Sequence, residues 1–237
     1  MFENLGLVNM RGRLLAASGL AAPTHGNSKM ATLHEGDFSL EIRHREFEHG
    51  WVYYDIWPKW RGEPILNDAI LKRHNTPWAK RGVGAIKACE YRECEVLPLL
   101  RRVLETNQPD YWTATDPDIT LALYPDRGFP FLPPKSRVVY EAPHIIAERE
   151  ARDRKRLETG PLPDDLIEMM LFVDVYNFSG AGAYHGSGTC FRFTPLRLEL
   201  QKFYDDLRAE YVLFREAWNV QALNEEEYGE DYLPKEF

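Results

Sequence analysis

Cysteine, long apolar runs and complete catalytic motifs are scarce or missing in this 237-residue sequence. Its cysteines, Cys89, Cys94 and Cys190, are too few and odd in number for a disulfide framework, and no C-x2-C pair offers two thiolates to zinc. No stretch approaches the roughly 20 apolar residues of a membrane-spanning helix. We therefore expect a cytoplasmic protein with reduced thiols, no metal, no cofactor and no contact with a membrane.

A surplus of positive charge is also missing. The chain has 29 Lys and Arg against 37 Asp and Glu, a net charge of −8, and residues 225–237 hold six acidic residues beside one lysine. A field of this sign repels phosphate backbones, so we expect no nucleic-acid partner. The acidic end is either a solvated tail or a segment that attracts a basic partner.

The patterns that are present indicate a globular α+β protein. Alternation of apolar and polar residues predicts strands at 38–42, 51–57, 83–89, 119–124, 168–178 and 184–193. Apolar residues at three- and four-residue spacing predict helices over 94–106, stopped by Asn107, and over 196–218, with the Thr194 hydroxyl as N-cap. We expect antiparallel sheets backed by amphipathic helices, arranged as a duplicated β–β–α unit or as two unrelated halves.

Composition shifts divide the chain into five segments. Residues 1–30 hold two arginines and a short, interrupted apolar run, which we interpret as a flexible leader, with a signal for export as the alternative. Residues 31–142 form the first α+β half, 143–163 a charged linker, 164–222 the second half and 223–237 the acidic tail.

The second predicted hairpin carries the residues most suited to catalysis: Asp174, His185, Ser187 and Cys190. Ser187 lacks the spacing of a nucleophile elbow, and strand alternation puts His185 and Cys190 on opposite faces. A glycine-kinked strand is favoured over a catalytic one. His44 and His49 flank the first predicted hairpin turn, where we expect a pair on the surface.

Aromatic side chains crowd the predicted strand 51–57. Trp51, Tyr53 and Trp57 alternate with Val52, Tyr54 and Ile56, so both faces of this strand carry large apolar groups. Either the sheet is covered on both sides, or the face with Trp51, Tyr53 and Trp57 binds a partner, since Tyr and Trp commonly anchor protein interfaces.

The second half of the chain is predicted to run as strand, hairpin, strand and helix. The segments that carry this layout are Phe-Val-Asp-Val-Tyr-Asn-Phe (172–178), the glycine-rich stretch up to Thr189 and Leu-Gln-Lys-Phe-Tyr-Asp-Asp-Leu-Arg-Ala-Glu (200–210). This layout resembles that of WapI-type bacterial toxin-immunity proteins. The resemblance implies a cytosolic, non-enzymatic protein that blocks a toxin by binding it, and it transfers no site residues.

Three functional hypotheses follow. The first is a non-catalytic, immunity-like module that binds another protein through Trp51, Tyr53 and Trp57 and through the acidic tail. The second is a hydrolase or transferase with its site at the 174–190 hairpin, and the third is a structural subunit of a larger assembly. The sequence favours a binding protein over an enzyme and does not determine the oligomeric state.

Overall fold

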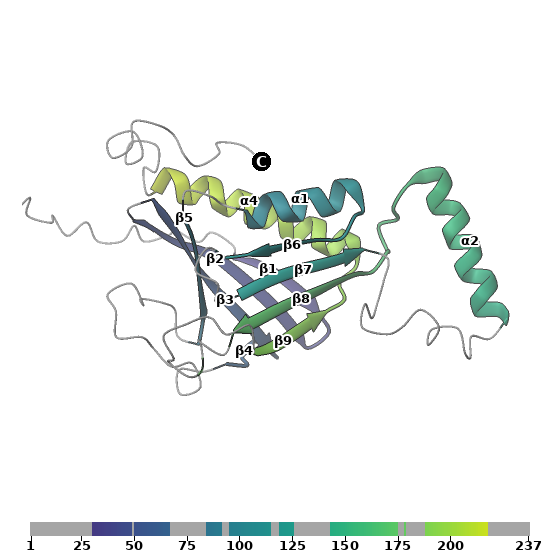
Figure 1. Cartoon of the computed structure of the whole chain (residues 1–237). Helices are drawn as coiled ribbons and strands as arrows, with labels where there is room; N and C mark the ends of the chain where they lie inside the picture. Colours follow the sequence, from purple (N-terminus) through teal and green to yellow (C-terminus); the bar gives the residue numbers. More distant parts are fainter. Residues whose placement is uncertain are drawn as a thin grey trace, which may run out of the picture.

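The computed structural model describes residues 30–48, 50–66, 84–91, 95–114, 119–125, 143–174, 178 and 188–217. They form two antiparallel sheets and three helices, which confirms the expected α+β class (Figure 1). None of the described helices is long and apolar enough to cross a membrane.

Sheet A is built from the first half of the chain. Its strands are β1 (Ala31–Glu35), β2 (Phe38–Glu48), β3 (Trp51–Trp60), β4 (Glu63–Pro64) and β5 (Ile86–Tyr91). β3 lies at its centre, paired with β2 on one side and with β4 and β5 on the other. The predicted hairpin of strands 38–42 and 51–57 is therefore confirmed, and both strands are longer than expected.

Sheet B is a four-stranded meander in the order β6 (Asp110–Thr113), β7 (Ile119–Pro125), β8 (Ile167–Asp174) and β9 (Gly188–Phe193). Ile167, Met169, Leu171 and Val173 alternate along β8 and are fully buried, as period-2 patterning requires. Gly188 packs so closely on β8 that a Cβ there would lie 1.9 Å from the carbonyl oxygen of Val173, which excludes any other residue.

The helices are α1 (Val96–Thr106), α2 (Pro143–Thr159) and α4 (Arg197–Ala217). α1 and α4 lie together along one side of the two sheets, whereas α2 projects away from them (Figure 1). α1 ends as predicted at Asn107, whose left-handed backbone (φ 54°) lets its N–H donate to the carbonyl of Val103. The charged segment expected as a linker contains helix α2.

Buried residues of both sheets and of α1 and α4 form one hydrophobic cluster. Leu40, Ile42, Tyr54 and Ile56 of sheet A belong to it together with the inner residues of sheet B. Each sheet is followed by one helix, but a duplicated β–β–α unit is not confirmed, since each group has four or more strands and α2 interrupts the second.

The predicted N-cap of the last helix is wrong. The Thr194 hydroxyl donates to Glu35 Oε1 at 2.5 Å, and the Thr194 N–H donates to Glu35 Oε2 at 2.6 Å. Glu199 takes over at the start of α4 by accepting a hydrogen bond from the Leu196 N–H at 2.9 Å, as the acid of a capping box does. Thr194 therefore joins sheet A to the start of α4 instead of capping it.

Candidate binding surface on sheet A

The three predicted binding residues lie on the outer face of β3, which faces away from the core. Val52, Tyr54 and Ile56 are fully buried among core residues, so strand alternation turns Trp51, Tyr53 and Trp57 to the opposite side. The grouping expected from the sequence is present, although its members differ in accessibility.

Tyr53 lies beneath this surface. Only 4% of it is exposed, and the guanidinium carbon of Arg45 lies 5.4 Å from the ring centroid. Arg45 is held in place by Glu46 at 3.0 Å and Asp55 at 3.4 Å. Tyr53 therefore supports the surface through a cation–π contact and is unavailable to a partner in this conformation.

Trp51 and Trp57 are half-buried, and each has a neighbour that orients its ring. The ring centroid of Trp51 lies 5.1 Å from that of Tyr91, which is 37% exposed. Lys59 Nζ lies 5.8 Å from the ring centroid of Trp57 and 2.5 Å from Glu41 Oε2. Two half-buried tryptophans thus flank the buried Tyr53.

Tyr91 is a surface residue that the sequence reasoning missed. The predicted strand ended at Cys89, but β5 continues to Tyr91, which pairs with Trp51 across the sheet. The available signal was alternation, because Tyr91 lies two residues beyond Cys89 and must share its face. We call Trp51, Tyr53, Trp57 and Tyr91 the outer aromatic face.

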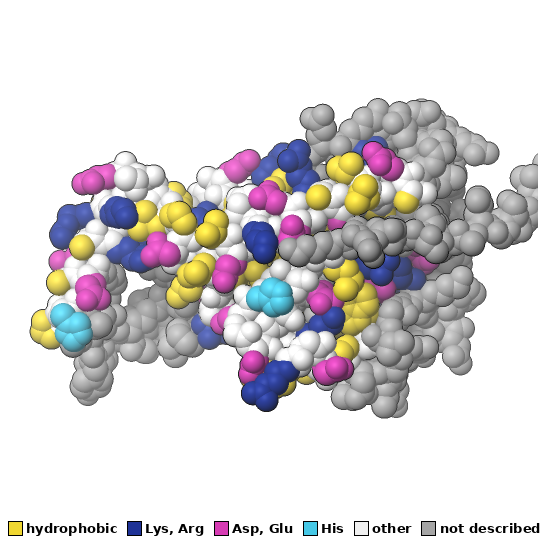
Figure 2. Space-filling model, turned by 180° about the vertical axis from the view of Figure 1, so that it is seen from behind, with side chains coloured by type: hydrophobic (Ala, Val, Ile, Leu, Met, Phe, Trp, Pro, Cys, Tyr) yellow, Lys and Arg dark blue, Asp and Glu magenta, His cyan; other side chains and the backbone are white. Residues whose placement is uncertain are grey.

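Sheet A lies behind sheet B in Figure 1, and Figure 2 views the molecule from that side. Acidic and basic side chains of the described residues alternate there with hydrophobic ones and form no continuous field of one sign (Figure 2). On the described residues of this view there is no continuous basic track of the kind that a nucleic-acid backbone requires.

Two of the four predicted catalytic residues, Asp174 and Cys190, lie in the described part of the chain. Asp174 ends β8 and is fully buried, and Cys190 lies exposed on β9, on the same outer face of sheet B. His185 and Ser187 lie outside the described residues. Partial burial and the negative charge of Glu168 raise the pKa of the Cys190 thiol, which keeps it protonated and weakens it as a nucleophile.

A buried carboxyl group, Glu90, links the two sheets and was not predicted. It accepts hydrogen bonds from the Tyr54 hydroxyl of β3, the Trp112 indole of β6 and the Glu95 N–H at the start of α1, the last at 3.1 Å. Burial raises the pKa of Glu90 to about 7, against the lowering effect of these hydrogen bonds. The group is enclosed and fully engaged, so its role is structural.

His44 is a second buried polar group, and the expected surface histidine pair is wrong for this residue. Its side chain is fully enclosed on β2, with Nδ1 3.6 Å from Glu210 Oε2 of α4, while its backbone N–H donates to Glu210 Oε1 at 2.9 Å. Tyr54, Tyr211 and Phe214 surround the ring at centroid distances of 5.1–5.4 Å. His49 lies outside the described residues.

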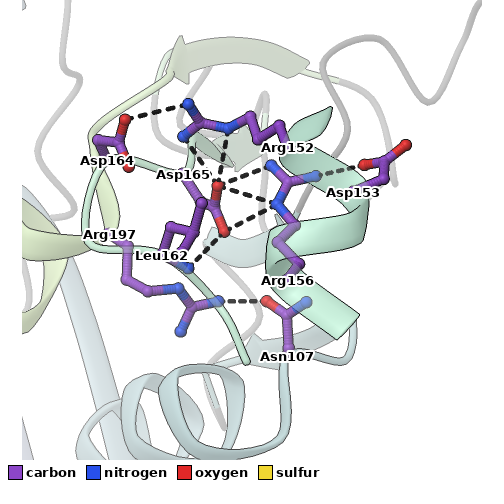
Figure 3. Close-up of polar contacts among 8 residues, drawn as sticks. All are labelled: Asn107, Arg152, Asp153, Arg156, Leu162, Asp164, Asp165 and Arg197. Carbon is purple, nitrogen blue, oxygen red and sulfur yellow. Dashed lines mark hydrogen bonds and ion pairs between the residues drawn. The ribbon is translucent and has the colours of Figure 1, made fainter. Parts of the chain in front are cut away.

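A third polar cluster fixes the C-terminal part of α2 (Figure 3). The buried carboxylate of Asp165 accepts hydrogen bonds from Arg156 at 2.7 Å, Arg152 at 2.9 Å and the Leu162 N–H at 2.7 Å. Burial alone would raise the pKa of Asp165, but these hydrogen bonds and the charge of Arg156 hold it below its ordinary value. Beside it, Arg197 donates to Asn107 and so ties α4 to α1.

Among the described residues, no group of three or more His, Cys, Asp or Glu side chains could hold a metal ion. Comparison of the chain with models of known protein families, with curated proteins and with solved structures found no match.

Proposed function

We propose that this protein is a non-catalytic module that acts by binding another protein through the outer aromatic face of sheet A. The observation that carries the proposal is the arrangement of the outer aromatic face. Trp51, Trp57 and Tyr91 are partly accessible and lie around Tyr53, which is buried and held by a cation–π contact with Arg45. Large aromatic side chains that are already held in place lose little conformational entropy on binding and dominate the free energy of many interfaces.

The polar groups of the described core support the same proposal. Glu90, His44 and Asp165 are buried, and each is held by defined protein partners, as structural polar groups of a core are. The raised pKa of the Cys190 thiol is the reverse of what a nucleophile requires. These features favour binding over the hydrolase or transferase hypothesis.

The proposal extends to the class of partner. The resemblance of 172–210 to WapI-type immunity proteins implies a bacterial toxin that is blocked by direct binding. The net charge of −8 suits a basic partner, because opposite charge speeds encounter and disfavours other partners.

The test is affinity capture from the native host with the wild-type chain and with a Trp51→Ser/Trp57→Ser variant. We expect one protein in stoichiometric amount with the wild type and its loss with the variant. A Tyr111→Ser chain, altered at a residue of sheet B that is 67% exposed, serves as the matched control and should retain the partner. Equal capture by the double variant, with its fold verified by circular dichroism, would contradict the proposal.

Native mass measurement distinguishes a binding module from the third hypothesis, a structural subunit of a larger assembly. A structural subunit would co-purify in a larger assembly of fixed composition without added bait. A binding module that awaits its partner would be recovered alone or as a single defined complex.

A further inference from the structure

An apolar hollow lies where the start of β2, the end of β3 and β4 come close to β9. Its volume is about 560 Å³, within the range of sites that hold ligands. The residues that line it are Phe38, Trp60, Glu63, Pro64, Ile65 and Phe191. This hollow is separate from the outer aromatic face, because Phe38 and Trp60 lie on the opposite side of their strands from Trp57.

Two exposed aromatic rings form the mouth of the hollow. Phe38 and Trp60 are 41% and 42% exposed, and their rings meet edge to face at a centroid distance of 4.5 Å. Neither ring belongs to the hydrophobic core cluster. Large apolar surface of this kind, left in contact with water at a concave site, marks a binding position.

Two tight turns, one between β1 and β2 and one between β3 and β4, contact each other beside the hollow and hold one of its walls in place. Arg61 and Gly62 connect β3 to β4 with positive φ angles of 50° and 84°, and Arg61 is a residue that rarely adopts this conformation. Its N–H donates to the carbonyl of Asp37 at 2.7 Å, and its Nε donates to the Asp37 carboxylate at 3.0 Å. Positive φ angles at both central residues are typical of a two-residue hairpin turn, and the two hydrogen bonds to Asp37 fix the position of this turn beside the hollow.

β9 supplies the other wall and a strand edge. It is the last strand of sheet B, and among the described residues it pairs only with β8. Phe191 pairs with the core residue Leu171, so its side chain points into the layer between the two sheets, where it lines the hollow. The outer N–H and C=O groups of such an edge strand are a template for one more strand.

We propose that the hollow and the β9 edge form a docking site for an extended peptide segment of a partner protein. A strand added to β9 would lie about 4.8 Å beyond it, and its inward side chains, spaced about 7 Å apart, would enter the same layer as Phe191. The hollow lies in that layer. An extended peptide could therefore pair with the edge of β9 and place a side chain in the hollow at the same time. The mode is β-augmentation, in which backbone hydrogen bonds give affinity and side-chain pockets give specificity.

Charge narrows the chemistry of the segment. Glu63 on the rim is exposed and has no ion-pair partner among the described residues, whereas Arg61 is already paired with Asp37. The guanidinium carbon of Arg61 lies 5.5 Å from the Trp60 ring centroid, but its charge is balanced by Asp37. Glu63 and the net charge of −8 therefore favour a segment with a large apolar side chain next to a Lys or Arg. This site does not depend on the outer aromatic face.

The test is a selection of random decapeptides displayed on phage against the wild-type chain, with counter-selection on Phe38→Ser/Trp60→Ser. We expect enriched peptides that carry one large apolar residue near a basic one. In synthetic form, measured by fluorescence anisotropy, they should bind Trp60→Ser at least tenfold more weakly and Glu63→Lys several-fold more weakly. N-methylation of alternate backbone amides should also reduce their affinity at least tenfold.

Three matched variants serve as controls and should leave the affinity unchanged. Tyr111→Ser alters an exposed aromatic residue on the opposite edge of sheet B, Glu158→Lys reverses an exposed charge on α2, and Trp51→Ser alters the outer aromatic face. Because Trp60 and Glu63 are exposed outside the core, both test variants should keep the circular dichroism spectrum and thermal midpoint of the wild type.

Three results would overturn the assignment. One is the absence of any peptide enriched over the counter-selecting variant. Another is binding that survives N-methylation, since it would exclude an added strand. The last is a dimer, observed by sedimentation and lost in Trp60→Ser, since it would identify a second copy of the chain as the occupant.

Discussion

Glu90 and Asp165 are both almost completely buried, yet burial has opposite outcomes at these two sites. Around Glu90 every hydrogen-bond donor is neutral, and burial raises the pKa to about 7. Around Asp165 two guanidinium groups donate, and the pKa falls below its ordinary value. Two features differ between the sites. Glu90 lies deep in the core and has only neutral donors, whereas Asp165 lies near the surface beneath the partly exposed Arg152 and Arg156, so a smaller desolvation cost and the neighbouring cations together keep its pKa low.

The difference corresponds to different tasks. Glu90 lies between the two sheets at the start of α1, where it satisfies the donors of Tyr54, Trp112 and Glu95. Asp165 lies at the base of the projecting helix α2, where Arg152 and Arg156 hold the helix end to the following turn (Figure 3). Glu90 therefore organises the core, and Asp165 positions helix α2.

The largest expected effect is that of Glu90→Ala. It leaves two buried donors, Tyr54 and Trp112, without an acceptor, and each such group costs about 1–3 kcal/mol, so we expect the free energy of unfolding to fall by at least roughly 2 kcal/mol. Urea denaturation measures it. Glu105→Ala, which removes an exposed acid from α1, is the control and should change stability by less than about 0.5 kcal/mol. A small effect of Glu90→Ala would mean that water replaces the carboxylate.

The pH dependence of stability gives the next largest effect. In the unfolded chain the Glu90 carboxyl ionises near its ordinary pKa of 4.5, whereas in the folded protein it ionises near pH 7. Between these values the folded protein binds more protons, so this group should lower the free energy of unfolding as pH rises, by up to about 3 kcal/mol in total.

This contribution should change through pH 7 and become constant about one pH unit above the folded-state pKa. Glu90→Gln, which cannot ionise, should lack it, and the difference between the two unfolding curves from pH 4.5 to 8 measures it. Parallel curves for wild type and Glu90→Gln would show that the carboxyl is ionised in the folded protein and would remove the contrast with Asp165.

Removal of one cation from Asp165 should have a smaller effect. Arg156→Gln leaves Arg152 in place, so we expect a loss of about 1–2 kcal/mol at pH 7 from a weakened charge-assisted hydrogen-bond network. The lowered pKa of Asp165 means that its stabilisation is present above pH 3.8 and is lost as the pH falls below it. The deficit of Arg156→Gln should therefore shrink in acid.

Arg154→Gln, at an exposed position of the same helix, provides the matched control for Arg156→Gln and should be close to neutral. If the deficit of Arg156→Gln stayed the same from pH 7 to pH 3, the loss would come from side-chain packing and not from the charge of Asp165.

The smallest effect concerns the Cys190 thiol, whose surroundings raise its pKa as those of Glu90 do. Since the thiol is kept protonated by partial burial and by Glu168, its alkylation by iodoacetamide at pH 7 should be slower than that of free cysteine. Mass spectrometry of the peptide that contains Cys190 measures the rate. Faster labelling than free cysteine would revive the hydrolase or transferase hypothesis.

Periodicity made most of the fold predictable. The β2–β3 hairpin and strands β7 and β8 follow from alternation, and α1 and α4 follow from apolar stripes, because these signals come from residues close together in the chain. Short strands gave no such signal: β1 (Ala31–Glu35) and β6 (Asp110–Thr113) have too few residues to show a period. The Thr194 cap was wrong because Glu35, far away in the sequence, competes for the same hydroxyl.

The candidate site was predictable only in part. Alternation placed Trp51, Tyr53 and Trp57 on one face, but the burial of Tyr53 depends on Arg45, which a bulge in β2 brings over the ring. His44 and Glu90 have the same phase as Leu40 and Ile86 in their strands, so their inward direction could have been predicted. Their partners Glu210 and Trp112 come from distant elements, and no local pattern reveals them.

Hydrogen exchange of the full chain with and without its captured partner tests the central claim most directly. We expect slower exchange of backbone amides in β3 between Trp51 and Trp57 and in β5 near Tyr91, with no change in β6. Protection confined to other elements, with β3 unaffected, would contradict binding through the outer aromatic face.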